Sequence, residues 1–234
     1  MISLNLRAND TSTIWFGVPT WFEVDGPPLT EAQVAARING KKVLILAHGY
    51  NTRDAVDFYS RIAMHMGRHY DEIIGVSAPL SRFGWAFWFA TMRAGKAGRL
   101  LVEVMSRFEP AILDIQGHSL GCRVTLEALD HGLYVRNAIL AAAAVDNESI
   151  QEREKYALAV QRAEKILVAY SRHDSVLGRA YKLGMLDTAL GFNGPQNPLL
   201  CDRRIELLDC SDWVNDHSGY RKCRPFFERW RAIA

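Results

Sequence analysis

Apolar runs of strand length alternate with longer amphipathic stretches along most of the chain. The runs are apolar at consecutive positions, which is typical of strands buried on both faces of a sheet. They are KKVLILAHG, DEIIGVSAP, AILDIQGHS, RNAILAAAAVD, KILVAYSRHD and RRIELLDCSDW. The stretches between them carry apolar residues at helical spacing, as at Ala55, Phe58, Ile62 and Met66 in TRDAVDFYSRIAMHMGRH.

Helices are therefore expected between the strands and at the end of the chain. The segments are EAQVAARING, TRDAVDFYSRIAMHMGRH, MRAGKAGRLLVEVMSRFE, LGCRVTLEALDHG, SIQEREKYALAVQRAE, SVLGRAYKLGMLDTAL and GYRKCRPFFERWRAIA. The early segment TIWFGVPTWF is expected to be an edge strand or hairpin, because Pro19 cannot donate to a ladder. This alternation predicts one α/β domain over residues 1–234, with a mostly parallel sheet flanked by helices on both faces.

Composition narrows the class of protein. The 234 residues are 49% hydrophobic and 23% charged, which fits a globular domain with a large core, and the net charge of +2 is too small to indicate a nucleic-acid partner. The opening residues lack the pattern of a signal peptide, and the longest apolar run, NAILAAAAVD, is too short to span a membrane. The four cysteines have no CxxC spacing, so we expect free thiols in a reducing, cytoplasmic location. No HxxEH-like or paired His/Asp spacing indicates a metal site.

One serine lies between two glycines where a buried strand turns into a helix. The segment ILDIQGHSLGCRVTLEAL contains Gly117-His118-Ser119-Leu120-Gly121, a G-x-S-x-G pattern with a strand before it and a helix after it. A sharp strand-to-helix turn strains its apex residue and exposes the serine oxygen, while glycines on either side remove clashing side chains. The pattern predicts that Ser119 is a nucleophile.

A serine hydroxyl needs a base, and the base needs an acid that orients it. In this architecture the chain order is nucleophile, acid, base. His217 is the expected base, because its loop between the last strand and the last helix returns to the carboxyl end of the sheet. Asp174, at the end of KILVAYSRHD, is the favoured acid, and Asp146, at the end of the preceding strand, is the alternative; either could instead cap a helix.

The loop after an early strand is expected to complete an oxyanion hole. LILAHGYNTRD provides a buried strand followed by His48-Gly49-Tyr50-Asn51, and His48 is expected to brace that loop. The backbone N–H groups of Tyr50 and Leu120 are predicted to converge on one substrate oxygen.

Together these segments resemble the α/β-hydrolase superfamily, and within it small serine hydrolases or esterases of uncharacterised families. The resemblance covers roughly residues 40–234 and rests on VLILAHGYNTRDAVDFYSRIA, GVSAPLS, IQGHSLGCRVTLEAL, AYSRHDSVL and DHSGY. It implies a single α/β-hydrolase domain, a Ser119–Asp174–His217 triad, and ester hydrolysis without metal or cofactor. Such proteins often read SWP in the second loop, where this chain has Ser77-Ala78-Pro79.

An aromatic, lid-like segment spans about residues 79–97. Its aromatic side chains include Trp85, Phe87 and Trp88, which are expected to bind the substrate; the alternative is that they are core contacts of a helix start. An apolar acyl ester is the expected small-molecule substrate. An acyltransferase or thioesterase using the same three residues, and a non-catalytic binding protein on a hydrolase scaffold, remain alternatives. The sequence predicts neither acyl chain length nor oligomeric state.

Overall fold

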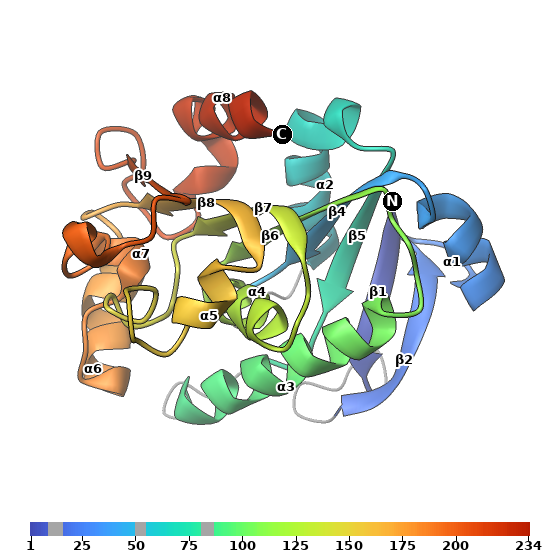
Figure 1. The fold of residues 1–234 in the computed structure, drawn as a ribbon, viewed down its shortest axis with the longest axis horizontal. Coiled ribbons are helices and arrows are strands. Elements are labelled where there is room, and N and C mark those ends of the chain that lie inside the picture. Colours follow the sequence, from blue (N-terminus) through green and yellow to red (C-terminus); the bar gives the residue numbers. More distant parts are fainter. Residues whose placement is uncertain (9–15, 50–54, 81–86) are drawn as a thin grey trace.

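The computed structural model describes residues 1–8, 16–49, 55–80 and 87–234 (Figure 1). Its strands are β1 (Ile2–Arg7), β2 (Phe16–Glu23), β3 (Pro28–Leu29), β4 (Lys42–Ala47), β5 (Glu72–Ser77), β6 (Ile112–His118), β7 (Val135–Ala141), β8 (Ala163–Tyr170) and β9 (Ile205–Asp209). Its α-helices are α1 (Glu31–Ile38), α2 (Ala55–Met66), α3 (Phe87–Met105), α4 (Leu120–Asp130), α5 (Ala157–Val160), α6 (Lys182–Met185), α7 (Leu190–Asn193) and α8 (Arg224–Ile233). Short helical turns occur at Gly67–His69, Val176–Tyr181, Pro198–Leu200 and Gly219–Lys222.

The described strands form one sheet in the order β3-β2-β1-β5-β4-β6-β7-β8-β9. Neighbouring strands are parallel along the part of the sheet that runs from β1 through β5, β4, β6, β7 and β8 to β9. β2 is antiparallel to β1, and β3 is antiparallel to β2. The expected mostly parallel sheet is therefore confirmed. From β4 the chain first moves outward to β5 and then returns to β6 on the other side of β4. This reversal makes the carboxyl ends of β4 and β6 a topological switch point, where ligands bind in open α/β sheets.

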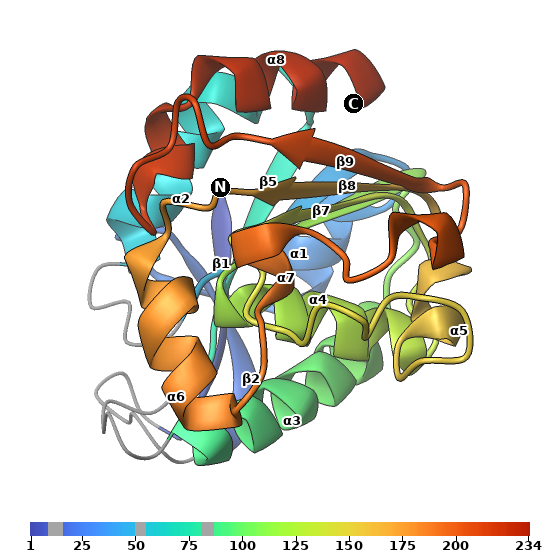
Figure 2. The same cartoon turned by 90° about the vertical axis from the view of Figure 1, so that its left-hand side faces the viewer.

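Helices cover both faces of the sheet, as Figure 2 shows, with α2 and α8 on one side and α3 and α4 on the other. On β4, Val43 and Ile45 pack into the core shared with α3 and α4, whereas Leu44 and Leu46 pack into the core shared with α2 and α8. Both sets of alternating side chains are therefore buried, which explains why the strand is a continuous apolar run.

Two strand predictions are refined by the structure. β2 pairs with β1 along its length, but β3 pairs only with Trp21 and Phe22, so Pro19 lies where β2 forms the edge of the sheet. The first residues, which the apolar pattern leaves unassigned, form β1 between β2 and β5.

The prediction of a helix over SIQEREKYALAVQRAE is wrong. Only Ala157–Val160 is helical there, and residues 149–156 form turns closed by a hydrogen bond from the Tyr156 N–H to the Ser149 carbonyl at 2.7 Å. Gln151 instead bridges to Cys201, and its side-chain amide donates to the Asn147 carbonyl at 3.3 Å. Tertiary hydrogen bonds of a buried segment override its helix propensity.

Two further helices differ in extent from the sequence pattern. The α3 helix begins at Phe87 and not near Met92, so much of the lid-like segment is helix. The helix expected after Asp174 is divided into a π-helical turn, α6 and α7. In the described part of the chain, no helix has both the length and the apolarity needed to cross a membrane.

Candidate active site

Ser119 lies at the apex of a tight turn between β6 and α4. Its backbone has φ 57° and ψ −122°, a conformation that costs a non-glycine residue on the order of 1–3 kcal/mol. The Ser119 N–H donates to the Ala141 carbonyl at 3.0 Å, and the Ser119 carbonyl accepts from the N–H groups of Cys122 and Ala144, both at 3.1 Å. Hydrogen bonds to β7 and its loop therefore hold the strained turn in place.

The two glycines that flank the turn are required by close backbone contacts. A Cβ atom on Gly117 would lie 2.6 Å from the Cα and N atoms of Cys122 in α4. On Gly121 it would lie 2.1 Å from the carbonyl oxygen of Ala47, at the end of β4. The glycines thus let α4 begin directly against β6 and β4.

Gly121→Ala is expected to destabilise the fold by about 2–3 kcal/mol or to prevent folding, because the new methyl group overlaps rigid backbone. Urea unfolding of the variant measures this loss. Gly67→Ala is the matched control, since a Cβ there meets no atom within 4 Å, and it is expected to change stability by less than about 0.5 kcal/mol. Equal stability of the two variants would contradict the proposed role of Gly121.

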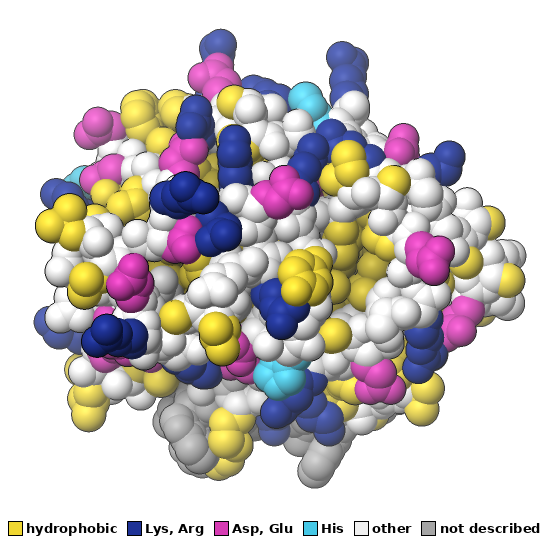
Figure 3. Space-filling model, in the orientation of Figure 1, with side chains coloured by type: hydrophobic (Ala, Val, Ile, Leu, Met, Phe, Trp, Pro, Cys, Tyr) yellow, Lys and Arg dark blue, Asp and Glu magenta, His cyan; other side chains and the backbone are white. Residues whose placement is uncertain are grey.

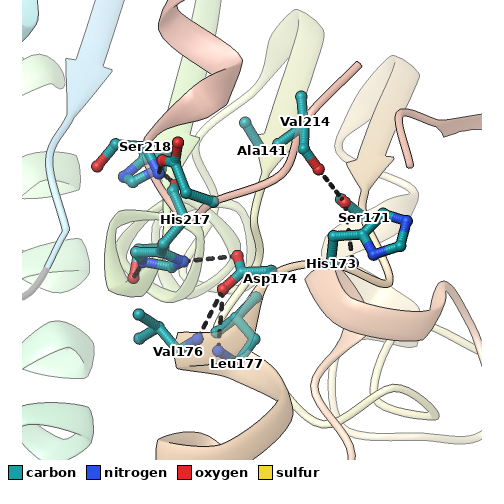
Figure 4. A network of polar contacts seen from close by, with 12 residues as sticks. Ala141, Ser171, His173, Asp174, Val176, Leu177, Val214, His217 and Ser218 are labelled. Carbon is teal, nitrogen blue, oxygen red and sulfur yellow. Dashed lines mark hydrogen bonds and ion pairs between the residues drawn. The ribbon is translucent and has the colours of Figure 1, made fainter. Parts of the chain in front are cut away.

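Three polar side chains form a continuous hydrogen-bonded chain at the switch point. Ser119 Oγ lies 2.8 Å from His217 Nε2, and His217 Nδ1 lies 2.7 Å from Asp174 Oδ2. The Asp174 side chain is fully buried, and its Oδ1 accepts from the N–H groups of Val176 and Leu177 at 3.1 and 3.0 Å (Figure 4). The structure therefore brings together Ser119, His217 and Asp174, from three separate loops.

Asp174 is held where three different elements meet. The turn that starts at Val176 directs two backbone N–H groups at one carboxylate oxygen, which leaves the other oxygen for the His217 ring, as Figure 4 shows. Backbone donors stabilise the ionised carboxylate in this buried position. An ionised carboxylate can only accept hydrogen bonds, so His217 Nδ1 carries the hydrogen and the lone pair on Nε2 faces Ser119.

Asp146 does not approach the histidine. Its Oδ1 accepts from the hydroxyl of Tyr181 at 2.6 Å, and its backbone forms an isolated bridge with Ala189. β7 ends at Ala141, so Asp146 lies several residues beyond the strand and not at its end. The geometry thus favours Asp174 over Asp146 as the partner of His217.

The loop that carries His217 is anchored at several points. Ser171 Oγ donates to the Val214 carbonyl at 2.6 Å, and the Ser218 N–H donates to Asp216 Oδ1 at 2.7 Å. His118, the residue before Ser119, donates from Nε2 to the His217 carbonyl at 2.8 Å. The residue next to the serine in sequence therefore fixes the backbone of the histidine 99 positions later.

The sequence pattern gives His118 no role of its own, although the residue lies inside the G-x-S-x-G pattern. The carbonyl of His217 can only accept, so His118 Nε2 carries the hydrogen. Burial lowers the pKa of His118 from 6.5 to about 3, and burial also lowers the pKa of His48 to about 4. Both rings are therefore neutral near neutral pH.

These two buried histidines predict a loss of stability in acid. Each has a folded pKa below its ordinary value of 6.5, so below pH 6.5 the unfolded chain binds protons that the folded chain does not. The stability that depends on the neutral state of the two histidines is expected to be complete above pH 6.5. Below that pH, the free energy of unfolding is expected to fall toward pH 4 by about 1.4 kcal/mol per pH unit for each histidine. Urea unfolding at several pH values measures the slope.

His118→Gln keeps an N–H donor at the Nε2 position but does not titrate. It is expected to reduce the acid slope by the contribution of one histidine while keeping the contact with His217. An unchanged slope in this variant would show that His118 is not responsible for the acid sensitivity.

Part of the expected oxyanion hole can be described. Leu120 is the first residue of α4, so its backbone N–H has no partner within the helix. Tyr50 lies outside the described residues. Gly49, just before it, packs directly on the serine, because a Cβ there would lie 2.8 Å from Ser119 Cβ. His48 Nδ1 lies 2.7 Å from the Gly49 carbonyl, which agrees with a bracing role for His48.

The residues expected to bind the substrate lie outside the described part of the structure. Trp85 falls in residues 81–86, and the side chains of Phe87 and Trp88 at the start of α3 are not described either. One turn further along α3, the side chains of Phe89 and Met92 are exposed. Among the described residues, no cluster of three or more His, Cys, Asp or Glu side chains could hold a metal ion, and the four cysteines are free thiols.

No protein-family model matches the chain, and no curated protein sequence matches it. The fold is similar to that of several solved structures. The crystal structure of TT1662 from Thermus thermophilus is 14% identical, with 92% of this chain and 94% of that chain covered and a TM-score of 0.50. An uncharacterized protein from Bacillus cereus is 16% identical, with a TM-score of 0.54; the match covers 83% of this chain and 58% of the Bacillus protein.

A third similar structure, carboxyl esterase 2 from the fungus Tuber melanosporum, is 10% identical, with 92% and 78% of the two chains covered and a TM-score of 0.44. Identities this low show the fold and not the activity. The sheet with its switch point, the strained serine turn between β6 and α4, and the similarity to the TT1662 and Bacillus cereus structures all support the same fold. The chain therefore has an α/β-hydrolase fold.

Proposed function

We propose that this protein is a serine hydrolase that cleaves carboxylic esters of apolar acyl groups through an acyl-enzyme intermediate. The observation that carries the proposal is the unbroken hydrogen-bond chain from Asp174 through His217 to Ser119, at a strained strand-to-helix turn. Because the three side chains already lie within hydrogen-bond distance of one another, proton transfer between them needs little rearrangement.

In the first half of the reaction, Ser119 Oγ attacks the ester carbonyl carbon while His217 Nε2 accepts its proton. Asp174 stabilises the resulting imidazolium, and the Leu120 N–H, with the Tyr50 N–H as the expected second donor, stabilises the negative oxygen. His217 then donates the proton to the alkoxide, the carbon–oxygen bond to the alcohol breaks, and the acyl group stays on Ser119.

In the second half, His217 accepts a proton from a water molecule, whose oxygen attacks the acyl carbon. The bond to Ser119 Oγ breaks, the serine recovers its proton from His217, and the carboxylic acid leaves. A thioester would follow the same path with a thiol as the leaving group. An acyltransferase would differ only by an alcohol that replaces water in this step.

Hydrolysis of a series of p-nitrophenyl esters, from short to long acyl chains, tests the proposal. We expect turnover of at least part of the series, and the preferred chain length measures the size of the acyl site. Added alcohols that divert the acyl group into new esters would identify a transferase. No turnover of any ester, together with no reaction with a fluorophosphonate, would favour a binding protein on a hydrolase scaffold.

A further inference from the structure

Apolar side chains project into solvent from α3 and from the end of α6. Leu183 and Leu186 are 80% and 90% exposed, and Met92 is 51% exposed. Most large aliphatic side chains of the described chain are buried, and Leu183 and Leu186 are among the most exposed of them. We refer to Met92, Leu183 and Leu186 as the apolar rim.

In Figure 3, hydrophobic and basic side chains lie next to one another at the lower left, where Figure 1 places α6. The segment with the two leucines begins at the turn whose N–H groups bind Asp174, and it continues through α6. Figures 1 and 2 both place α6 beside the N-terminal end of α3, and the two helices are in contact. Two segments that are distant in sequence and that both carry exposed apolar side chains therefore lie next to each other.

The charge of these two segments is mostly positive. Residues 87–102 contain Arg93, Lys96 and Arg99 but no Asp or Glu, and residues 175–187 contain Arg179 and Lys182, with Asp187 directly after Leu186 as their one acid. None of these five cations forms an ion pair with a carboxylate of the described residues. In the whole chain, by contrast, 28 basic residues face 26 acidic ones, so the positive charge here is local.

We propose that the apolar rim docks on the surface of an anionic lipid bilayer. Exposed aliphatic side chains that insert among headgroups, with Lys and Arg beside them, are the two features that bind peripheral proteins to anionic membranes. A stable protein partner would instead need about 20–30 residues on each side of an interface, with charged residues depleted at its core. Three projecting side chains among five cations match a lipid surface better.

The docked orientation would bring the proposed ester-cleaving site close to lipid, and this consequence rests on the proposed function. The binding itself does not depend on Ser119, because the rim contains no member of the hydrogen-bonded chain. Binding and hydrolysis can therefore be tested separately, and the failure of one is distinguishable from the failure of the other.

Sedimentation with lipid vesicles tests the proposal. We expect the full chain to pellet with phosphatidylcholine vesicles that contain about 30% phosphatidylglycerol, and to bind pure phosphatidylcholine at least about tenfold more weakly. Leu183→Ser with Leu186→Ser is expected to weaken binding to the anionic vesicles about tenfold, and Arg179→Gln with Lys182→Gln to weaken it by a similar factor. Ser119→Ala is expected to bind as the wild type does.

Matched substitutions elsewhere on the surface provide the controls. Leu158 and Leu199 are 68% and 92% exposed, and they lie on α5 and on the turn at Pro198–Leu200. The double variant Leu158→Ser, Leu199→Ser is expected to bind the anionic vesicles with an affinity within about twofold of the wild type. The same is expected of the double variant Lys165→Gln, Arg203→Gln. Binding that does not depend on anionic lipid, no binding at all, or equal losses in rim and control variants would each overturn the proposal; absence of binding would leave an acidic protein as the alternative partner of this surface.

Discussion

Ser119→Ala is expected to lower kcat for ester hydrolysis by roughly 10⁶-fold while leaving KM nearly unchanged. The substitution removes the only atom that forms the acyl bond, and the remaining acceleration comes from substrate binding and oxyanion stabilisation alone. Steady-state kinetics on the best p-nitrophenyl ester measure the loss.

Ser106→Ala is the matched control for this loss. Ser106 is exposed, and its hydroxyl donates only to the Glu103 carbonyl at the end of α3. We expect activity within about twofold of the wild type. If Ser119→Ala retained most of the activity, the esterase activity would have to come from another group, and the proposed nucleophile would be wrong.

Asp174→Asn is expected to lower kcat by about 10⁴-fold. The carboxylate both orients the His217 ring and stabilises its charge in the transition state, and an amide does neither well. The amide oxygen can still accept hydrogen bonds from the backbone N–H groups of Val176 and Leu177, so the fold is expected to survive. Thermal unfolding of the variant checks that the loss is not caused by misfolding.

Asp146→Asn separates the two acidic residues that the sequence leaves open. Asp146 is bonded to Tyr181 and not to His217, so its amide variant is expected to keep activity within about threefold of the wild type. A large loss of activity in Asp146→Asn with little loss in Asp174→Asn would identify Asp146 as the acid that acts on His217. Equal losses would indicate that neither acts on His217 alone.

Much of the fold could be predicted from sequence because its strands are buried on both faces. The run of β4 is apolar at consecutive positions from Val43 to Ala47 for a physical reason, since Ile45 and Leu46 fill different cores. The serine turn was recognisable for a similar reason: Gly117 and Gly121 are fixed by backbone contacts that no side chain could tolerate. Patterns of this kind arise from local sterics and are therefore visible in the sequence.

Other features depend on tertiary contacts that no local pattern encodes. The preference for Asp174 over Asp146 rests on the turn at Val176 and on the contact of Asp146 with Tyr181, 35 residues away. The contact between His118 and the His217 carbonyl joins residues 99 apart, so the spacing of the serine motif gives no sign of it. The segment Ser149–Tyr156 has a helical pattern of polar residues, but its backbone pairs with a distant segment instead: Gln151 bridges to Cys201, and the Glu152 N–H donates to the Leu200 carbonyl.

The most direct test of the central claim is to identify the residue that a fluorophosphonate modifies. The folded protein is treated with the reagent, and the adduct is located by peptide mass spectrometry, with protein unfolded in urea as the control. We predict one adduct per chain, on Ser119, formed in the folded protein and absent from the unfolded one. An adduct on another residue, equal labelling after unfolding, or no adduct at all would contradict the account of Ser119, His217 and Asp174 as a catalytic unit.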